Sequence, residues 1–204
     1  MDSYNHEKNL TTKVSATIPL DRIGVLIGKD GSTKNRIEQA FKTHLIIQSE
    51  NGIVEIIPSE GSDDPTTILR ARDVIVAIAR GFSPHRALRL VDDDIVLDVI
   101  DLRETFGRNE RDIARLKGRV IGREGKIRRL IEEMTNAQVS VYGHTITMLG
   151  EFETVTAARE AIELLLKGKQ HSTVYKLLRK IKSESKKRET LELWQKPPAS
   201  PQIK

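Results

Sequence analysis

The sequence predicts an α+β protein that is built from two copies of one unit and ends in a basic helix. Three observations predict this fold. The segment Val25–Gly31 recurs 94 residues later within Gly118–Gly125, and both segments contain the pattern Gly-x-x-Gly. Around each segment the elements follow one order: strand, short helix, Gly-x-x-Gly, helix, strand, strand, helix. Near the end, Lys167–Arg188 contains nine Lys or Arg and one acid.

The first copy begins with an expected strand at 13–18, where apolar and polar residues alternate. After its glycine loop we expect a helix, and then strands at 44–49 and 53–57. Asn51-Gly52 between them predicts a hairpin with a two-residue turn. An amphipathic helix at 66–80 completes the copy.

The second copy begins with an expected strand at 95–102 and ends with a helix at 153–167. Between them, a hairpin joins strands at 137–142 and 144–149. This copy is longer before its loop, which indicates an insertion around 103–112. One face of the second hairpin is expected to carry Val139, Val141, Ile146 and Met148.

The remaining segments set the expected organisation of the chain. Ser83-Pro84 predicts a capped helical linker, since proline suits the first helical turn. The limits that we expect are a polar segment at 1–9, a first domain at 10–82, a linker at 83–91, a second domain at 92–170, a basic helix at 171–187 and a flexible tail at 188–204.

Composition excludes several classes of protein. The 204 residues are 38% hydrophobic and 31% charged, which favours small globular cores over disorder. The absence of cysteine excludes disulfides, thiolate metal sites and cysteine nucleophiles. The longest apolar runs are far below the roughly 20 residues of a membrane span, and the polar start is no signal peptide. We expect a soluble, cytoplasmic monomer without membrane contact.

The glycine loops predict contact with a polyanion. Without Cβ atoms the backbone can approach a phosphate closely, and the amides at the following helix start point at the anion. Charge ranks the two loops: Gly107–Leu130 carries a net charge of +6, whereas Asp21–Lys42 carries +2. The second loop is therefore the stronger candidate for RNA binding.

This repeated order resembles the eukaryotic-type (type I) K-homology, or KH, domain. The segments Ile100–Arg103, Gly118–Lys126 and Val139–Gly143 resemble the partner-of-Nob (Dim/Pno) family of small-subunit pre-rRNA processing proteins. Eukaryotic members of that family have lost the first loop and carry a long N-terminal extension. Gly28 and Gly31 are present here without such an extension, so the chain looks archaeal.

The resemblance implies a function and partners. It implies a non-enzymatic protein that binds single-stranded RNA at the 3′ end of small-subunit rRNA and presents it to the Nob endonuclease. It also implies the alpha subunit of translation initiation factor two as a partner. The expected RNA-binding residues are Ile27, Gly28, Lys29, Asp30, Gly31, Lys34, Arg119, Ile121, Gly122, Arg123, Glu124, Gly125, Lys126, Arg128 and Arg129.

Two further groups of basic residues are auxiliary candidates. In the basic helix, Val174, Leu177, Leu178 and Ile181 predict a docking face on the second domain. The opposite face is expected to carry the cations. The auxiliary candidates are Arg103, Arg108 and Arg111 in the insertion, and Lys176, Arg179, Lys180 and Lys182 in the helix.

Other chemistry finds little support in the sequence. Gly24–Lys29 imitates a P-loop, but it has one residue too few between its glycines, and Asp30 stands where Ser or Thr is needed. The carboxylates between 92 and 101 lack metal-ligand spacing, and the five histidines are scattered, so we expect no cofactor, metal or catalytic site. A protein–protein adaptor with secondary RNA binding remains the alternative. Trp194 fits either a partner anchor or an exposed side chain.

Overall fold

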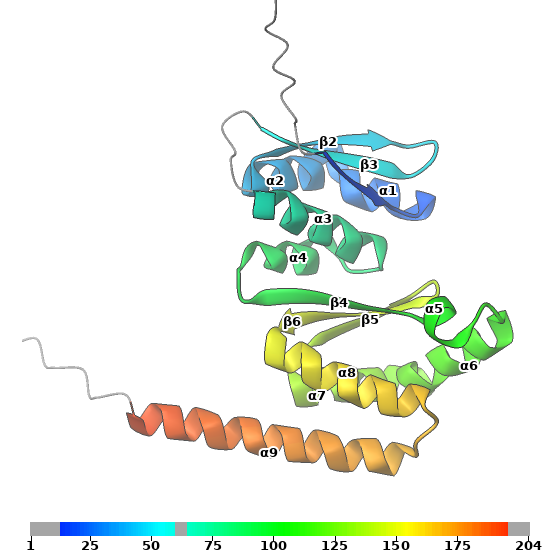
Figure 1. Ribbon diagram of the computed structural model, residues 1–204, viewed down its shortest axis with the longest axis vertical. Coiled ribbons are helices and arrows are strands. Elements are labelled where there is room, and N and C mark those ends of the chain that lie inside the picture. The colour runs from blue at the N-terminus through cyan, green and yellow to red at the C-terminus, as the bar shows by residue number, and fades with distance from the viewer. Residues whose placement is uncertain (1–12, 60–64, 196–204) are drawn as a thin grey trace, which may run out of the picture. The chain divides into compact units, whose positions relative to one another are not determined.

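The computed structural model describes the backbone of residues 13–59 and 65–195, with side chains except at 65, 189 and 192–195. The polar segment predicted at 1–9 and the side chain of Trp194 lie outside the described part. Two compact units make up the chain. Unit 1 comprises Met1–Leu97 and Ser140–Thr147, and unit 2 comprises Asp98–Val139 and Met148–Lys204. Both contain helices and strands (Figure 1), as the predicted α+β class requires.

The first repeat is a three-stranded antiparallel sheet with helices on one face (Figure 1). The strand order is β1-β3-β2, so the hairpin strand β3 lies in the centre. Its apolar residues alternate with the pleat, and Leu45, Val54 and Ile56 are buried beneath the helices. The elements are β1 (Val14–Thr17), α1 (Leu20–Ile27), α2 (Ser32–Phe41), β2 (Thr43–Gln48), β3 (Ile53–Pro58) and α3 (Pro65–Ala79).

The first hairpin exists as predicted, but its turn is longer than the two residues expected. Strand β2 ends at Gln48 and β3 begins at Ile53, and these two residues are paired. The turn therefore has four residues. Asn51 accepts a hydrogen bond from the Ile53 amide, and only Gly52 has a positive φ, of 70°. A two-residue type I′ turn needs positive φ at both positions, which Asn51 does not adopt.

The expected helical linker is present as α4 (Pro84–Ala87), which continues into a 3₁₀ turn, Leu88–Val91. Pro84 stands at the start of this helix as predicted, while Ser83 makes no side-chain capping bond. Asp93, just beyond the linker, forms an ion pair with Arg70 of α3.

The second repeat has the same order of elements, with a sheet ordered β4-β6-β5. The predicted insertion forms α5 and the first turn of α6. Asp101 caps α5, since its side chain accepts hydrogen bonds from the Arg103 and Glu104 amides. The elements are β4 (Ile95–Asp101), α5 (Leu102–Phe106), α6 (Glu110–Ile121), α7 (Lys126–Thr135), β5 (Gln138–Tyr142), β6 (Thr145–Glu151) and α8 (Phe152–Leu166).

Strand β6 is buried on both of its faces. Ile146 and Met148 are buried as expected, but Thr145, Thr147 and Leu149 on the other face are buried as well. A central strand that is covered on both faces does not show the alternation of a half-exposed one.

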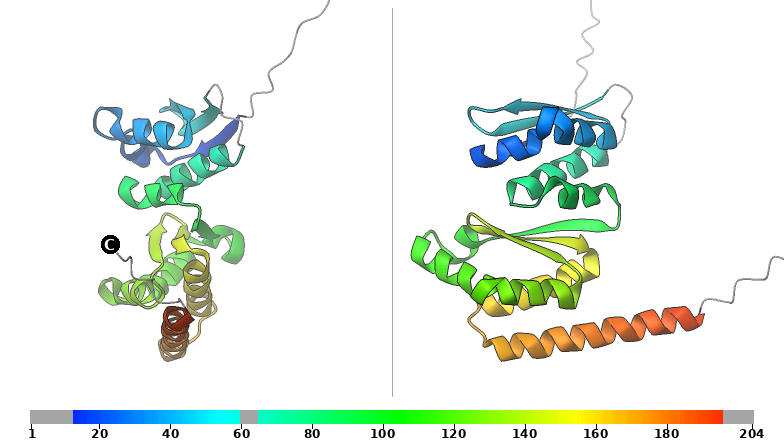
Figure 2. Two further views of the ribbon diagram at one scale, coloured as in Figure 1. Left: turned by 90° about the vertical axis from the view of Figure 1, so that its left-hand side faces the viewer. Right: turned by 180° about the vertical axis from the view of Figure 1, so that it is seen from behind.

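Helix α9 (His171–Gln195) packs on α7 and α8, on the side away from the second sheet (Figure 2). Val174 and Leu178 are buried, so the predicted docking face is confirmed, although Leu177 and Ile181 are only half-buried. The helix ends eight residues beyond the expected 187. The segment 188–195 contains no glycine or proline, and the next proline along the chain is Pro197. No helix-breaking residue therefore stands between 188 and 195.

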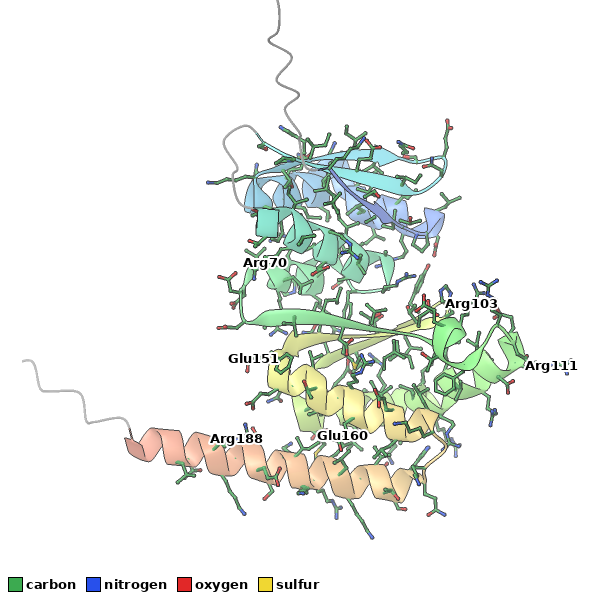
Figure 3. The ribbon with its side chains drawn as sticks, viewed as in Figure 1. Arg70, Arg103, Arg111, Glu151, Glu160 and Arg188 are labelled. Atoms are coloured by element: carbon green, nitrogen blue, oxygen red, sulfur yellow. The ribbon has the colours of Figure 1, made fainter. Side chains whose placement is uncertain are left out.

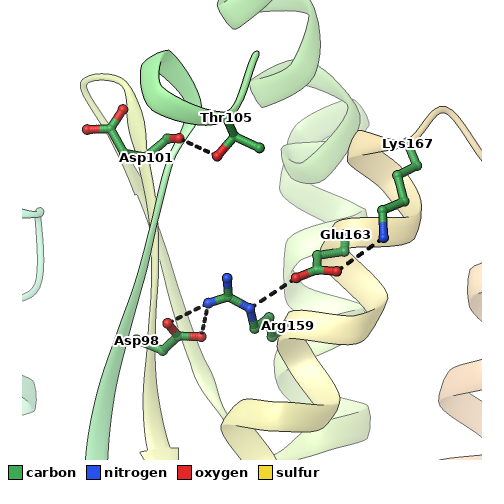
Figure 4. A network of polar contacts seen from close by, with 6 residues as sticks. All are labelled: Asp98, Asp101, Thr105, Arg159, Glu163 and Lys167. Atoms are coloured by element: carbon green, nitrogen blue, oxygen red, sulfur yellow. Dashed lines mark hydrogen bonds and ion pairs between the residues drawn. The ribbon is translucent and has the colours of Figure 1, made fainter. Parts of the chain in front are cut away.

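A polar network ties α8 to β4 (Figure 4). Both carboxylate oxygens of Asp98 accept hydrogen bonds of 2.6 Å from Nη1 of Arg159, and Nε of Arg159 donates to Glu163 at 3.0 Å. Lys167 donates to the second oxygen of Glu163 at 3.3 Å. The hydrogen bond to Asp98 raises the pKa of Arg159.

Within the part of the chain that the structure describes, no helix is both long enough and apolar enough to cross a membrane.

Candidate nucleic-acid interface

The two glycine loops have almost the same backbone conformation. We call Gly28–Gly31 the first loop and Gly122–Gly125 the second loop. The first glycine of each has φ and ψ near 70° and 176°, and the second glycine lies in the left-handed region. Asp30 and Glu124 between them are also left-handed, with φ of 52° and 55°. The repeat predicted from the sequence is therefore a repeat of backbone geometry.

The first glycine of each loop cannot be replaced without a clash. A Cβ at Gly28 would lie 2.4 Å from Oγ1 of Thr33, and a Cβ at Gly122 would lie 2.4 Å from Cγ1 of Ile127. A Cβ at Gly125 would meet open space. The first glycine thus lets each loop pack against its own following helix. Gly125 leaves an open side on which another molecule can approach the backbone, whereas at Gly31 a Cβ would lie 3.8 Å from the Asn35 side chain.

A glutamate ties each following helix to the next strand, which sequence analysis missed. Glu38 accepts the Leu45 amide at 2.8 Å, and Glu132 accepts the Val139 amide at 2.9 Å. The signal was available, because both glutamates and both amides are 94 residues apart. Each glutamate also attracts a cation one turn earlier. Lys34 lies 3.8 Å from Glu38, and Arg128 lies 3.3 Å from Glu132.

An arginine before each loop holds the end of the long helix of its repeat. Nε of Arg22 donates to the Ile78 carbonyl at 3.0 Å, and its Nη2 donates to the Phe82 carbonyl at 2.6 Å. Arg119 makes the same kind of contact, with Leu165 at 2.9 Å and Lys169 at 2.8 Å. These bonds satisfy carbonyls at the ends of α3 and α8. Arg119, Lys34 and Arg128, all expected at the RNA, thus have intramolecular partners.

The charged side chains at the loop surfaces differ between the repeats. Arg123 has 94% of its side chain exposed, Lys126 is exposed, and Arg129 donates to the Glu124 carbonyl at 2.8 Å. In the first repeat, Lys29 is exposed, but Ser32 and Asn35 occupy the positions of Lys126 and Arg129. The second loop therefore presents three cations beside one acid, and the first presents one beside one.

Apolar surface adjoins each loop. Ile27 ends α1 and Ile121 ends α6, and both side chains are partly exposed directly before the first glycine. Each repeat thus places an aliphatic residue, a glycine backbone and a cation next to one another. This is the arrangement with which an aliphatic groove receives bases while the loop receives the phosphate.

The auxiliary candidates lie in different surroundings. Arg103 and Arg111 project from the α5–α6 region (Figure 3), and Arg103 pairs with Glu110 at 2.6 Å. On α9, Lys176, Arg179 and Lys180 are exposed as expected. Lys182 is not on the opposite face: it is half-buried and donates to the Glu133 carbonyl of α7 at 3.4 Å. Lys182 comes four residues after buried Leu178, so it lies on the face of α9 that packs on the second repeat.

The carboxylates around β4 have structural partners rather than one another. Asp93 pairs with Arg70, Asp98 pairs with Arg159, and Asp101 caps α5. Within the described ranges, no group of three or more His, Cys, Asp or Glu is placed to hold a metal ion.

Comparison with family models assigns both repeats to one class of domain. Residues 13–76 match the KH domain model, and residues 96–183 match the model described as eukaryotic type KH-domain (KH-domain type I), in its second Pno1 form. The fold and the paired loops thus define a tandem KH-domain protein.

Known proteins are similar to this chain over most of its length. A KH domain-containing protein of Methanocaldococcus jannaschii is 48% identical over 88% of this chain and 78% of its own length. The pre-rRNA-processing protein pno1 of Aspergillus fumigatus is 30% identical over 72% of this chain, which spans 60% of that protein. A solved structure titled as an a/eIF2alpha-aDim2p-rRNA complex from Pyrococcus horikoshii aligns with a TM-score of 0.80 and 42% identity, over 87% of this chain and 98% of that one.

The chain belongs to the Pno1/Dim2 family of tandem KH-domain proteins. This confirms the family and the type I KH fold that the sequence predicted.

Proposed function

We propose that this chain binds single-stranded RNA through its glycine loops, with the second loop as the main contact. One observation carries the proposal: the loops share a backbone conformation, but only the second has Arg123, Lys126 and Arg129 around it. Contact with phosphate is chiefly electrostatic. The loop with more positive charge therefore binds each nucleotide more tightly.

The proposed binding mode follows from the open side of each loop. The phosphate backbone approaches Gly125, where a Cβ would meet open space, or Gly31, where the Asn35 side chain is the neighbour, and Arg123 or Lys29 neutralises it. Bases lie over Ile27 or Ile121, unpaired, because a duplex cannot splay them into the groove. Arg119 contributes by holding the end of α8, and Lys34 and Arg128 contribute by pairing with Glu38 and Glu132 within their own helices.

We further propose that the RNA is the 3′ end of small-subunit rRNA. The names of the relatives support this, since one is called a pre-rRNA-processing protein and another is part of an rRNA complex. In this proposal the chain performs no chemistry. As a cytoplasmic monomer it presents the rRNA end to the Nob endonuclease and contacts the alpha subunit of initiation factor two. The expected domain limits, 10–82 and 92–170, belong to the same proposal.

The alternative is an adaptor whose first repeat contacts a protein. Two observations favour it: the first loop has weak local charge, and the rRNA complex of the archaeal relative also contains a protein subunit. In that case the first loop contributes nothing to RNA affinity, while the second still binds.

A competition assay tests the proposal. The full chain is titrated with a labelled unpaired decanucleotide, and the competitors are the same unlabelled oligonucleotide and a hairpin stem of equal charge. We expect the stem to compete at least tenfold more weakly, because its bases are not free. Equal competition would contradict groove binding. Crosslinking in cells then tests the target, with adducts expected to cluster at the small-subunit 3′ end.

A further inference from the structure

We propose that RNA held by the second loop continues along the seam between α7 and α9. Four side chains of α9 form this path: Tyr175, Arg179, Lys182 and Lys186. We call them the α9 row. The inference rests on the proposed function and deepens it, because it assigns a second, adjoining contact for the same strand.

The α9 row begins beside the second loop. Tyr175 shares a small apolar cavity with Ile127 and Leu130 in the first two turns of α7, which starts directly after the loop. Further along, Lys182 donates to the Glu133 carbonyl near the end of α7. The two helices therefore run in the same direction, and the row leads away from the loop.

The spacing of the α9 row places its members on one face. Intervals of four, three and four residues return to the same side of a helix, and successive members lie about one turn, or ~5.4 Å, apart. Lys182 and Lys186 line the hollow at the end of α7 together with Met134 and Asn136. Arg179, between Tyr175 and Lys182, is exposed and makes no ion pair with the residues that the structure describes.

The neighbouring side of α7 adds positive charge. Lys126 and Arg129 stand at its start, next to the loop, and Glu133 is the acid along this side. The acid lies where Lys182 crosses over to α7. Cations therefore follow one another from Arg123 at the loop to Lys186, which is what an extended phosphate backbone requires.

Tyr175 gives the path a place for a base. Aromatic residues are only 4% of the chain, so one that is half-exposed within a basic row is informative. Single-strand binding sites combine a basic groove with aromatic rings on which bases stack. Tyr175 is placed to stack the first base that leaves the second KH groove.

The path ends near Lys186. The hollow that Lys182 and Lys186 line has a volume of about 490 Å³ and extends to α8, where Glu153 and Glu160 line it together with Glu184 of α9. Glu153 forms an ion pair with Arg188 at 2.7 Å. Arg188 on α9 and Glu160 on α8 lie where these two helices face each other (Figure 3). Acids repel phosphate, so the row reaches about 11 residues along α9, or ~16 Å.

The opposite flank of α9 provides a matched control. Lys180 and Lys187 are exposed and lie on a different side of α9 from the row, and Lys180 lies 3.9 Å from Glu184. We compare the double variant Arg179→Glu/Lys186→Glu with Lys180→Glu/Lys187→Glu. Each changes the net charge by the same four units, and Lys182 is untouched because it contacts α7.

Each variant is titrated with an unpaired tetranucleotide and with a decanucleotide over a range of salt. A KH loop clamps four nucleotides, so only the longer RNA reaches the α9 row. The first double variant should bind the decanucleotide at least tenfold more weakly, with a salt slope shallower by about 1.4 for two lost contacts. Its tetranucleotide affinity should change less than threefold. Tyr175→Leu, which keeps an apolar contact with α7, should weaken the decanucleotide about tenfold without changing the slope.

The control variant should change both affinities less than threefold. Equal losses in the two double variants would overturn the path and indicate a diffuse field of the helix. Equal decanucleotide and tetranucleotide affinity in the unmodified chain would overturn it as well. If the unmodified chain binds neither oligonucleotide, the proposed function itself fails. Circular dichroism and melting of each variant check that α9 still forms and packs.

Discussion

The first and second loops share a backbone but not a surface. Gly28 and Gly122 adopt the same conformation, and each is forced to be glycine by its own following helix. Around this frame the residues diverge. Ser32 and Asn35 in the first repeat correspond to Lys126 and Arg129 in the second, and exposed Arg36 corresponds to Leu130, which lies against α9.

The difference shows that loop geometry and ligand affinity are set by separate residues. The two glycines, the left-handed residue between them and the glutamate that accepts a strand amide recur at the same interval. These residues therefore maintain the shape of the loop. Of the exposed cations, Lys29 and Arg123 recur, but Lys126 and Arg129 have no cationic counterpart in the first repeat. The cations that differ therefore determine how strongly each loop attracts a phosphate. A first loop with an intact frame and weak charge is suited to a supporting contact.

The largest effect should come from removing α9, which packs on α7 and α8. A chain that ends at Gln170 keeps the Lys169 carbonyl for Arg119 but loses buried Val174 and Leu178. Each buried aliphatic side chain contributes about 1.5–3 kcal/mol before entropy, so we expect a net loss of about 3 kcal/mol in the free energy of unfolding. Urea unfolding measures it.

The same truncation also tests the charge of α9. The salt slope of RNA binding should become shallower by about 1 to 3 units, for two to four lost phosphate contacts. A chain that ends at Gln195 is the control, since it keeps the whole helix, and it should match the full chain in both measurements. Lost stability with an unchanged slope would show that the charge of α9 is only solvated.

The next effect compares the loops directly. Arg123→Asp places a second acid beside the phosphate contact and should weaken RNA binding about 30-fold, or about 2 kcal/mol. Lys29→Asp makes a comparable change in a weaker field and should cost about fivefold. Both sites are exposed, so melting temperatures should stay within about 2 °C. Fluorescence anisotropy measures the affinities. A larger loss for Lys29→Asp would reverse our ranking of the loops.

Substitution of the two glycines of the second loop distinguishes a role in stability from a role in RNA binding. Gly122→Ala forces a Cβ against Ile127 at φ and ψ that only glycine adopts readily, so we expect a loss of about 2–3 kcal/mol in stability. In Gly125→Ala the added Cβ meets open space, so only the strain of the left-handed backbone remains, which should lower the stability by about 1 kcal/mol. Its effect should instead appear in RNA affinity, because its methyl group faces the phosphate side. Equal stability losses in chemical unfolding would contradict this division of roles.

The sequence was sufficient for the order of elements, the hairpins and the docking face of α9. Each of these depends on local periodicity or on turn residues such as Gly52 and Gly143. It was also sufficient to locate both glycine loops, because two matching copies are a stronger signal than one. Repetition within a single chain thus substituted for a comparison between chains.

Local sequence patterns could not predict which basic residues have intramolecular hydrogen-bond partners. Arg119 reaches carbonyls 46 and 50 residues away, and Lys182 reaches one 49 residues away, so their partners depend on how helices pack. Burial of Thr145 and Thr147 likewise depends on what covers the second face of β6. A basic residue beside a loop is therefore a site candidate only after its intramolecular partners are known.

The smallest expected effect compares two acids in the long helices. Burial raises the pKa of Asp73 in α3, against the opposing charges of Arg72 and Arg70. At Glu163 in α8, burial is outweighed by hydrogen bonds and charge from Lys167 and Arg159, which lower its pKa. A group with a raised folded pKa binds protons more tightly when folded, so its contribution falls as pH rises; a lowered pKa has the opposite sign.

Acidification should therefore act on the two acids in opposite directions. Asp73→Asn should stabilise the chain by about 0.5 kcal/mol at pH 7, and this gain should vanish in a window that starts above pH ~3.9, the usual aspartate pKa, as the native carboxyl becomes protonated. Glu163→Gln should cost a few tenths of a kcal/mol at pH 7, because the network is largely exposed, and this cost should disappear below pH ~4.3. Urea unfolding of both variants from pH 3 to pH 7 measures the two slopes. Slopes of the same sign would show that one of these acids is held differently from the contacts described.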